Sequence, residues 1–262
     1  MDLNLNGKNA LVCGSSQGIG KAVSEELASL GASVTLFARN EETLNEVRGS
    51  LDLTKGQQHK VLVADFAEPK QVETAVKTYL KDNPPIHILV NNTGGPAPGP
   101  AHQAGEDAYL AAFKLHLLTN QVLVQNILPG MQAASFGRII NIISTSVKQP
   151  LDGLGVSNTI RGAVANWAKT LANELGVYGI TVNNVLPGAT QTARLQAILE
   201  SKAKKQGKAL AQLVEEEKAR IPLRCFGKAE DLGAAVGFLA SPAASYITGI
   251  NLPVDGGRTS CL

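Results

Sequence analysis

Three glycines near the start of the chain have a spacing that suits phosphate binding. Gly14, Gly18 and Gly20 follow a short apolar run over 10–12, within the stretch CGSSQGIG over 13–20. A glycine turn between a strand and a helix lets the backbone approach a pyrophosphate, and the free N–H groups of the helix N-terminus attract the anion. The spacing is G-x3-G-x-G rather than G-x-G-x-x-G. Taken alone, the cluster is therefore a weak signal: it fits a nucleotide-binding loop, and a purely structural turn is the alternative.

The segments that would position these glycines alternate between strands and helices. Almost continuous apolar runs over 10–12, 34–38, 60–64, 86–90, 138–143, 181–186 and 249–254 predict buried strands. Helices are predicted over 21–30, 105–134, 153–176, within 192–220, over 230–240, and from residues 41 and 69. This pattern is typical of a parallel sheet that is covered on both faces. We therefore expect an α/β fold: one Rossmann-type domain over 1–262, with a doubly wound parallel sheet of about seven strands flanked by helices, whose ligands bind at the strands' carboxyl ends.

The composition argues against several classes of function. The chain has 262 residues, a net charge of +2 and no basic block, so we expect neither a nucleic-acid nor a membrane partner. Cys13, Cys225 and Cys261 are widely spaced and odd in number, which argues against a disulfide framework and indicates a reducing, cytoplasmic setting. The first strand begins too early to leave room for a signal peptide, and no apolar run approaches the ~20 residues of a membrane helix. We expect no metal site.

Several motifs along the chain resemble those of the short-chain dehydrogenase/reductase family. The glycine stretch is similar to the family's T-G-x3-G-x-G, with Cys13 in place of threonine, and Asn91-Asn-Thr-Gly94 is similar to N-N-A-G. Residues 137–144 resemble the strand that ends in the catalytic serine, and Pro187-Gly-Ala-Thr-Gln-Thr192 resembles P-G-x3-T. The segments 221–227 and 248–257 resemble the tail of 3-oxoacyl-carrier-protein reductases. The resemblance implies an oxidoreductase that acts on a small carbonyl or alcohol and forms a homo-oligomer, a tetramer or dimer, through the helices at 105–134 and 153–176.

The resemblance also implies how the cofactor is bound. Arg39 stands at the end of the second predicted strand, where an acidic residue would bind the ribose 2′-OH of NAD, and an arginine suits the 2′-phosphate of NADP. A solvated Arg39 without a ligand is the alternative. We expect NADP(H), with NAD(H) possible. The expected cofactor-binding residues are Gly14, Ser15, Ser16, Gln17, Gly18, Ile19, Gly20, Arg39, Asp65, Phe66, Asn92, Thr93, Gly94, Arg161, Pro187, Gly188, Thr190 and Thr192, of which Asp65 and Phe66 resemble an adenine-binding pair.

The catalytic positions depart from the family's Asn-Ser-Tyr-Lys. Ser144 matches the serine, whereas His116, Ser157 and Arg161 stand where the asparagine, tyrosine and lysine belong. A serine hydroxyl is a far poorer acid than a phenol, and an arginine can bond a ribose or an oxyanion but cannot relay a proton as lysine can. Histidine titrates near neutral pH, so His116 is a candidate for the missing proton donor. The alternative is a packed histidine that fills the asparagine's space.

Three functions remain open at this point. The first is an NADP-preferring oxidoreductase in which Ser144 and His116 carry the activity, Ser157 is a bystander and Arg161 clamps the cofactor. The others are a catalytically weak or inactive NADP-binding or regulatory protein, and a non-redox enzyme such as an isomerase or lyase. The family keeps a substrate lid where this chain has 192–220. Two apolar helix faces occur in this segment, one formed by Leu195, Ile198 and Leu199 and the other by Leu210, Leu213 and Val214. They suit an apolar substrate, or else packing against the body of the protein or a neighbouring subunit.

Overall fold

Seven parallel strands form the middle layer of the molecule. In the computed structural model, which describes residues 1–261, they are β1 (Asn9–Cys13), β2 (Ser33–Ala38), β3 (Lys60–Val63), β4 (Ile88–Asn91), β5 (Gly137–Ile142), β6 (Ile180–Pro187) and β7 (Asn251–Val254). Their order is β3-β2-β1-β4-β5-β6-β7, and every neighbouring pair is parallel. The strand order reverses between β1 and β4, which is where sheets of this kind open a crevice for a ligand. The predicted doubly wound sheet is therefore confirmed.

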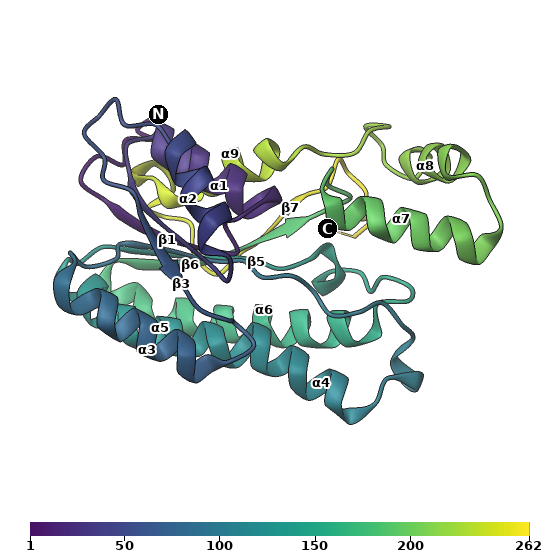
Figure 1. Ribbon diagram of the computed structural model, residues 1–262, viewed down its shortest axis with the longest axis horizontal. Helices are drawn as coiled ribbons and strands as arrows, with labels where there is room; N and C mark the ends of the chain where they lie inside the picture. Colours follow the sequence, from purple (N-terminus) through teal and green to yellow (C-terminus); the bar gives the residue numbers. More distant parts are fainter. Residues whose placement is uncertain (262) are drawn as a thin grey trace.

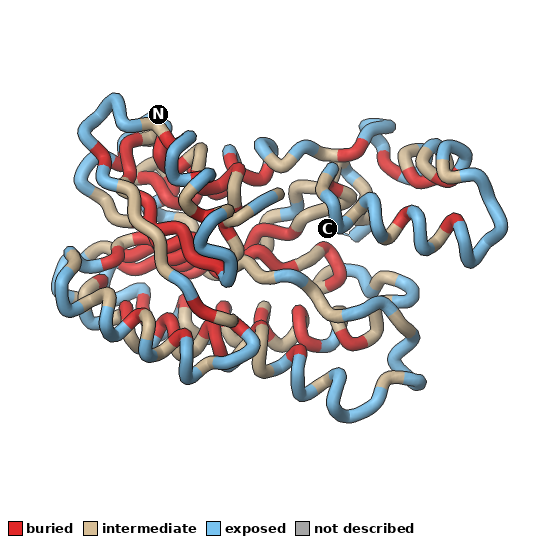
Figure 2. Tube along the Cα trace, in the orientation of Figure 1, coloured by how far each residue is buried: buried red, intermediate tan, exposed pale blue. Residues whose placement is uncertain are grey.

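Helices cover both faces of this sheet (Figure 1). One face carries α1 (Gly18–Ser29), α2 (Glu41–Ser50) and α9 (Ala229–Ala240), and the other carries α3 (Pro69–Asp82), α4 (Glu106–Phe113), α5 (Thr119–Ala133) and α6 (Gly155–Leu175). The helices α7 (Ala193–Gln206) and α8 (Leu210–Ala219) extend beyond the sheet as an arm. Short 3-10 helices occupy 101–103, 145–147, 176–178 and 242–244. Figure 2 shows that the strands β1, β2, β4, β5 and β6 are buried almost throughout, whereas the edge strands and most of the arm are exposed or half-buried.

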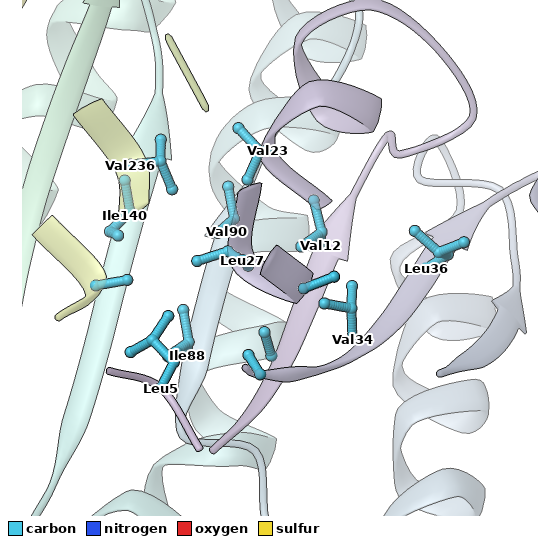
Figure 3. Packing of buried hydrophobic residues seen from close by; sticks show 14 of the residues in the cluster. Leu5, Val12, Val23, Leu27, Val34, Leu36, Ile88, Val90, Ile140 and Val236 are labelled. Atoms are coloured by element: carbon cyan, nitrogen blue, oxygen red, sulfur yellow. The ribbon is translucent and has the colours of Figure 1, made fainter. Parts of the chain in front are cut away.

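The sheet is held by an apolar core on each face. Val12, Val34 and Val90 of the central strands pack with Val23 and Leu27 of α1, as Figure 3 shows. The alternate strand residues point to the other face, where they pack against α3, α5 and α6 in a second cluster. A strand buried on both faces has no polar alternation, which explains the continuous apolar runs in the sequence.

A π-helical turn interrupts the long helix that the sequence predicts over 105–134. Residues Lys114–Leu118 form this turn between α4 and α5, so the predicted long helix is present over 106–133 but is not α-helical throughout. The Thr119 hydroxyl lies 3.0 Å from the carbonyl of Lys114 and 2.8 Å from that of Phe66, and so fills the widened turn with a hydrogen bond. Single π turns inside α-helices are often found at functional sites. This turn places His116 in the interior of the protein.

The apolar faces of the arm pack mainly on each other. Leu199 and Ala203 of α7 form a small core with Leu213 of α8 and with Ile221 and Phe226 beyond it. The Thr192 hydroxyl accepts a hydrogen bond from the N–H of Leu195 and so caps the start of α7. Packing thus accounts for most of the apolar pattern over 192–220. The remaining apolar side chains of α7, such as Ile198, line a cavity described below.

Candidate active site

The glycine turn after β1 packs tightly against the segment that follows β4. A Cβ atom at Gly14 would overlap the carbonyl oxygen of Asn92, and one at Gly20 would overlap the carbonyl oxygen of Gly14. The Asn92 amide donates to the carbonyls of Cys13 and Gly14 at 3.1 and 3.2 Å. Because no side chain fits inside this turn, its backbone stays close to the start of α1, where the unpaired N–H groups can face an anion.

Some of the predicted cofactor-binding residues have structural positions instead of facing the cavity. Ser15 is fully buried, and its hydroxyl accepts a hydrogen bond from the N–H of Phe37 at 2.8 Å. The ring of Phe66 is also buried and packs on that of Phe37, with centroids 4.7 Å apart. These contacts fix the ends of β1, β2 and β3 relative to one another. Of Phe66, only the backbone is left to meet a cofactor.

Arg39 lies directly after β2 at the carboxyl edge of the sheet. Its side chain is 75% exposed, and one guanidinium nitrogen lies 3.9 Å from a carboxylate oxygen of Asp65. The other carboxylate oxygen of Asp65 accepts a hydrogen bond from the N–H of Ala67. An exposed ion pair of this length contributes little to stability, so Arg39 can turn to a phosphate at small cost.

A cavity of about 1320 Å³ opens between the carboxyl ends of the central strands and the arm. The predicted site residues that line it are Gly14, Gln17, Gly18, Ile19, Asn92, Thr93, Gly94, Ser144, Ser157, Arg161, Pro187, Gly188, Thr190 and Thr192. Those that do not are Ser15, Ser16, Gly20, Arg39, Asp65, Phe66 and His116. Segments from five parts of the chain thus converge on one space, as ligand binding at the end of a parallel sheet requires.

Ser144 presents its hydroxyl to this cavity just beyond β5. Its oxygen accepts a hydrogen bond from the N–H of Ser146 at 3.1 Å. The hydroxyl proton is therefore free to be donated to a ligand oxygen. Ser157, in the first turn of α6, lines the same cavity and makes no hydrogen bond through its hydroxyl to the part of the chain that the structure describes.

Arg161 lies one turn further along α6 and is buried. Its guanidinium donates to the carbonyl of Ile142 at 3.1 Å and to that of Thr93 at 3.5 Å, so it joins the ends of β5 and β4. Within residues 1–261 it forms no ion pair with a carboxylate. Burial, with a contribution from the charge of Arg194, lowers the pKa of Arg161 to about 10. The guanidinium is still charged at neutral pH, and this charge faces the cavity without a counterion.

His116 lies behind the cavity wall and not on its surface. Its Nδ1 is 2.8 Å from the Thr93 hydroxyl, and its Nε2 has no hydrogen-bond partner among the described residues. Burial, followed by the charges of Arg161 and Arg194, lowers the pKa of His116 to about 2. The expectation of an imidazolium acid with a pKa near 6.5 is therefore wrong, because the two guanidiniums and the lack of solvent favour the neutral ring.

Arg194 and a cluster around Glu217 are site features that the sequence alone did not reveal. Arg194, in the first turn of α7, donates to the carbonyls of Gly95 and Pro96 at 3.0 and 3.3 Å. Glu217 is buried and meets three cations: Lys202 at 2.5 Å, Arg220 at 3.3 Å and Arg258 at 3.3 Å. Burial raises the pKa of Glu217, but the hydrogen bond and charge of Lys202, together with the charges of Arg220 and Arg258, outweigh it and lower that pKa. For Arg194, the sequence signal was its position two residues after Thr192. The cluster around Glu217 had no such signal, because its members lie far apart in the chain.

The buried neutral state of His116 predicts a loss of stability in mild acid. The unfolded histidine binds a proton below a pKa of about 6.5 whereas the folded one does not, so the free energy of unfolding falls as the pH drops below 6.5. Between pH 7.5 and 5.5 we expect His116 to contribute a loss of about 1.4 kcal/mol. Urea unfolding of the wild type and His116→Asn at both pH values measures it. Equal pH slopes in the two proteins would show that His116 titrates normally.

The chain matches known proteins along almost its whole length. Residues 14–259 match a family model described as enoyl-(acyl carrier protein) reductase. The chain is 33% identical over 257 residues to the 3-oxoacyl-[acyl-carrier-protein] reductase FabG of Haemophilus influenzae, covering 97% of this chain and 98% of that protein. The structure of L-sorbose reductase from Gluconobacter frateurii, complexed with NADPH and L-sorbose, superposes with a TM-score of 0.93 at 30% identity over 100% of both chains. That of YwfH, an NADPH-dependent reductase involved in bacilysin biosynthesis, gives 0.92 at 29% identity over 97% of this chain and 99% of that one.

Two further observations concern the described part of the chain. No helix within residues 1–261 combines the length and apolarity needed to cross a membrane. The same residues contain no group of three or more His, Cys, Asp or Glu side chains placed to hold a metal ion.

Proposed function

Because the chain belongs to the short-chain dehydrogenase/reductase family, we propose that it is an NADP-preferring oxidoreductase that transfers hydride between the nicotinamide and a small carbonyl or alcohol. One observation carries this proposal. The Ser144 hydroxyl and the Arg161 guanidinium line the same cavity as the glycine turn. A carbonyl compound that entered this cavity would therefore meet a hydrogen-bond donor and a positive charge beside the place where a nucleotide cofactor binds.

The residues present fit NADP(H) at three places. The glycine turn and the N-terminus of α1 would hold the pyrophosphate. Arg39, exposed at the end of β2, would hold the 2′-phosphate, and Arg161 would bond the nicotinamide ribose. NADPH in the L-sorbose reductase complex and the NADPH dependence of YwfH support this preference. NAD(H) lacks the 2′-phosphate, so it is expected to bind more weakly.

The chain's own residues would stabilise the charge that develops on the substrate oxygen. When bound, the cofactor supplies a hydride to the carbonyl carbon, and the oxygen becomes negative. The free proton of Ser144 can hydrogen-bond to this oxygen, and the charge of Arg161 lies in the same cavity. With His116 neutral and no tyrosine at position 157, the proton that completes the alcohol comes from water in the open cavity. Without a positioned acid the rate of reduction falls by about 10²- to 10⁴-fold. Holding the hydride close to the carbonyl carbon can lower the barrier by about 7–11 kcal/mol, which is larger than this loss.

Measuring NADPH oxidation against ketoses, oxo acids and 3-oxoacyl thioesters tests this function. Consumption of NADPH with an equal amount of alcohol product supports it. Binding of NADPH without turnover of any compound supports the second candidate, a non-catalytic NADP-binding protein, which the serine at position 157 favours. In that case Ser157→Tyr/Arg161→Lys, which restores the family's pair, is expected to turn over while the natural protein does not.

We also propose that α7 and α8 act as the substrate lid. Leu195, Ile198 and Lys202 of α7 line one wall of the cavity, and Glu217 of α8 lines it nearby. A lid formed by this arm would cover a bound substrate while leaving the strand ends in place.

A homo-oligomer, a dimer or tetramer, is expected from the family's habit of pairing its long helices. Leu110 and Phe113 of α4 and Leu118 of the π turn are exposed, at 57%, 37% and 41%, which suits a subunit contact. Light scattering should give a mass near two or four times 27.4 kDa. Leu110→Lys is expected to shift the mass toward one chain, whereas Leu53→Lys, at an exposed leucine elsewhere, should not. If light scattering gives the natural protein in solution the mass of one chain, 27.4 kDa, the oligomer is refuted.

A further inference from the structure

Positive charge dominates the wall of the cavity. Six cationic side chains line it, Arg161, Arg194, Lys202, Lys205, Arg220 and Arg258, against the two carboxylates of Asp152 and Glu217. A cavity with walls of one charge raises the local concentration of ligands of the opposite charge. The cavity as a whole therefore favours an anion.

Outside the cluster around Glu217 the positive charge lies on Arg161, Arg194 and Lys205, of which Lys205 is exposed near the end of α7. Glu217 meets Lys202, Arg220 and Arg258, whereas Arg161 and Arg194 donate only to backbone carbonyls within the described residues. Each guanidinium has five N–H donors and commits two of them to carbonyls, so three remain for a ligand. The two are near enough that the charge of Arg194 lowers the pKa of Arg161. Two like charges that face one cavity, neither of them paired with a carboxylate, are stabilised when an anion binds there.

The phosphates of the cofactor have other places in the molecule. The pyrophosphate would lie at the glycine turn and the 2′-phosphate at Arg39, which is outside the cavity wall. Arg194 is held by its hydrogen bonds to the carbonyls of Gly95 and Pro96, and Pro98 and the loop over 150–154 line the same cavity. Its free N–H groups are thus available on the side of the cavity that a substrate would occupy.

We propose that the substrate carries a carboxylate or a phosphate and that Arg194 binds this anionic group, within the positive field of Arg161. This proposal rests on the proposed function, since it names the substrate class of the same site. Carboxylate and phosphate share the oxygen geometry that an arginine binds with two parallel hydrogen bonds. The probes used in the test distinguish a carboxylate from a phosphate.

The test uses matched pairs of ketones that differ in one anionic group. The NADP⁺-saturated protein is titrated by calorimetry with 4-methyl-2-oxopentanoate and 4-methylpentan-2-one, and with dihydroxyacetone phosphate and dihydroxyacetone. We expect the charged member of at least one pair to bind at least about 10-fold more tightly at low salt. The pair that shows the difference identifies the anion. Equal affinity, or no binding of either charged probe, overturns the proposal.

Variants then assign the effect to Arg194. Arg194→Gln is expected to lower the affinity for the charged probe by about 10- to 100-fold, Arg194→Lys to retain most of it, and Lys204→Gln, on the same helix but outside the cavity lining, to change it less than about 3-fold. Arg48→Gln, on the far side of the molecule in α2, controls for net charge. If Arg194→Gln instead weakens NADPH binding and leaves the difference between paired probes intact, the guanidinium belongs to the cofactor and the proposal is wrong. Failure to oxidise NADPH with any carbonyl compound would refute the proposed function separately, because these titrations need no turnover.

Discussion

Ser144→Ala is expected to lower the rate of NADPH-dependent reduction by about 10²- to 10³-fold while leaving the affinity for NADPH within about 3-fold. The hydroxyl oxygen of Ser144 accepts a hydrogen bond from the N–H of Ser146, and its proton remains available to an oxygen in the cavity. Its contribution grows as charge develops on that oxygen, and its loss should therefore appear in kcat more than in KM. Single-turnover kinetics at saturating NADPH measure the effect.

Ser157→Ala is the matched control for this prediction. Ser157 has the same side chain and lines the same cavity, at the position where the family has its tyrosine. We expect its replacement to change the rate by less than about 3-fold, because a serine hydroxyl there is too poor an acid to replace a phenol. If the two variants lose equal activity, Ser144 has no special position relative to the substrate.

Arg39→Asp should reverse the cofactor preference. The guanidinium of Arg39 can exchange its exposed ion pair with Asp65 for the 2′-phosphate, and a charge-assisted hydrogen bond of this kind is worth about 1.5–3 kcal/mol, or roughly 10- to 150-fold in affinity. An aspartate would repel the phosphate and could accept a hydrogen bond from the ribose 2′-OH of NADH instead. Calorimetric titration of the natural protein and of Arg39→Asp with NADPH and with NADH measures the affinities.

Arg48→Asp makes the same change of charge on an exposed helix nearby and is the control. It should alter the NADPH affinity only through the net charge, and less at physiological salt. A natural protein that binds NADPH and NADH equally would show that Arg39 is merely solvated.

The sheet could be predicted from the sequence because each strand is a short apolar run that ends in a glycine or polar segment. The pattern of apolar residues is enough to locate the strands, and the seven predicted strands match the observed ones within two residues at either end. The π turn at Lys114–Leu118 could not be predicted, since it depends on the Thr119 hydroxyl reaching a carbonyl beyond its own helix. Helical periodicity continues on both sides and gives no sign of it.

The chemistry of the site was less predictable than its position. The family resemblance assigned Ser144, Ser157 and Arg161 to one catalytic site, and all three line one cavity. It gave no means of knowing that His116 is buried beside two guanidiniums, so its pKa could not be foreseen. Arg194 lies far from Arg161 in sequence, and only the fold brings their charges together. A pKa and a counterion depend on such tertiary neighbours, which a motif does not encode.

Transfer of deuterium from NADPH labelled at C4 of the nicotinamide tests the central claim most directly. The labelled cofactor is incubated with the protein and a ketone, and the product is examined by mass spectrometry. We predict an alcohol that carries one deuterium on the former carbonyl carbon, formed by the natural protein and about 10²- to 10³-fold more slowly by Ser144→Ala. If NADPH binds but deuterium enters a product only with the Ser157→Tyr/Arg161→Lys variant, the natural site binds the cofactor without catalysing hydride transfer, and the account is wrong.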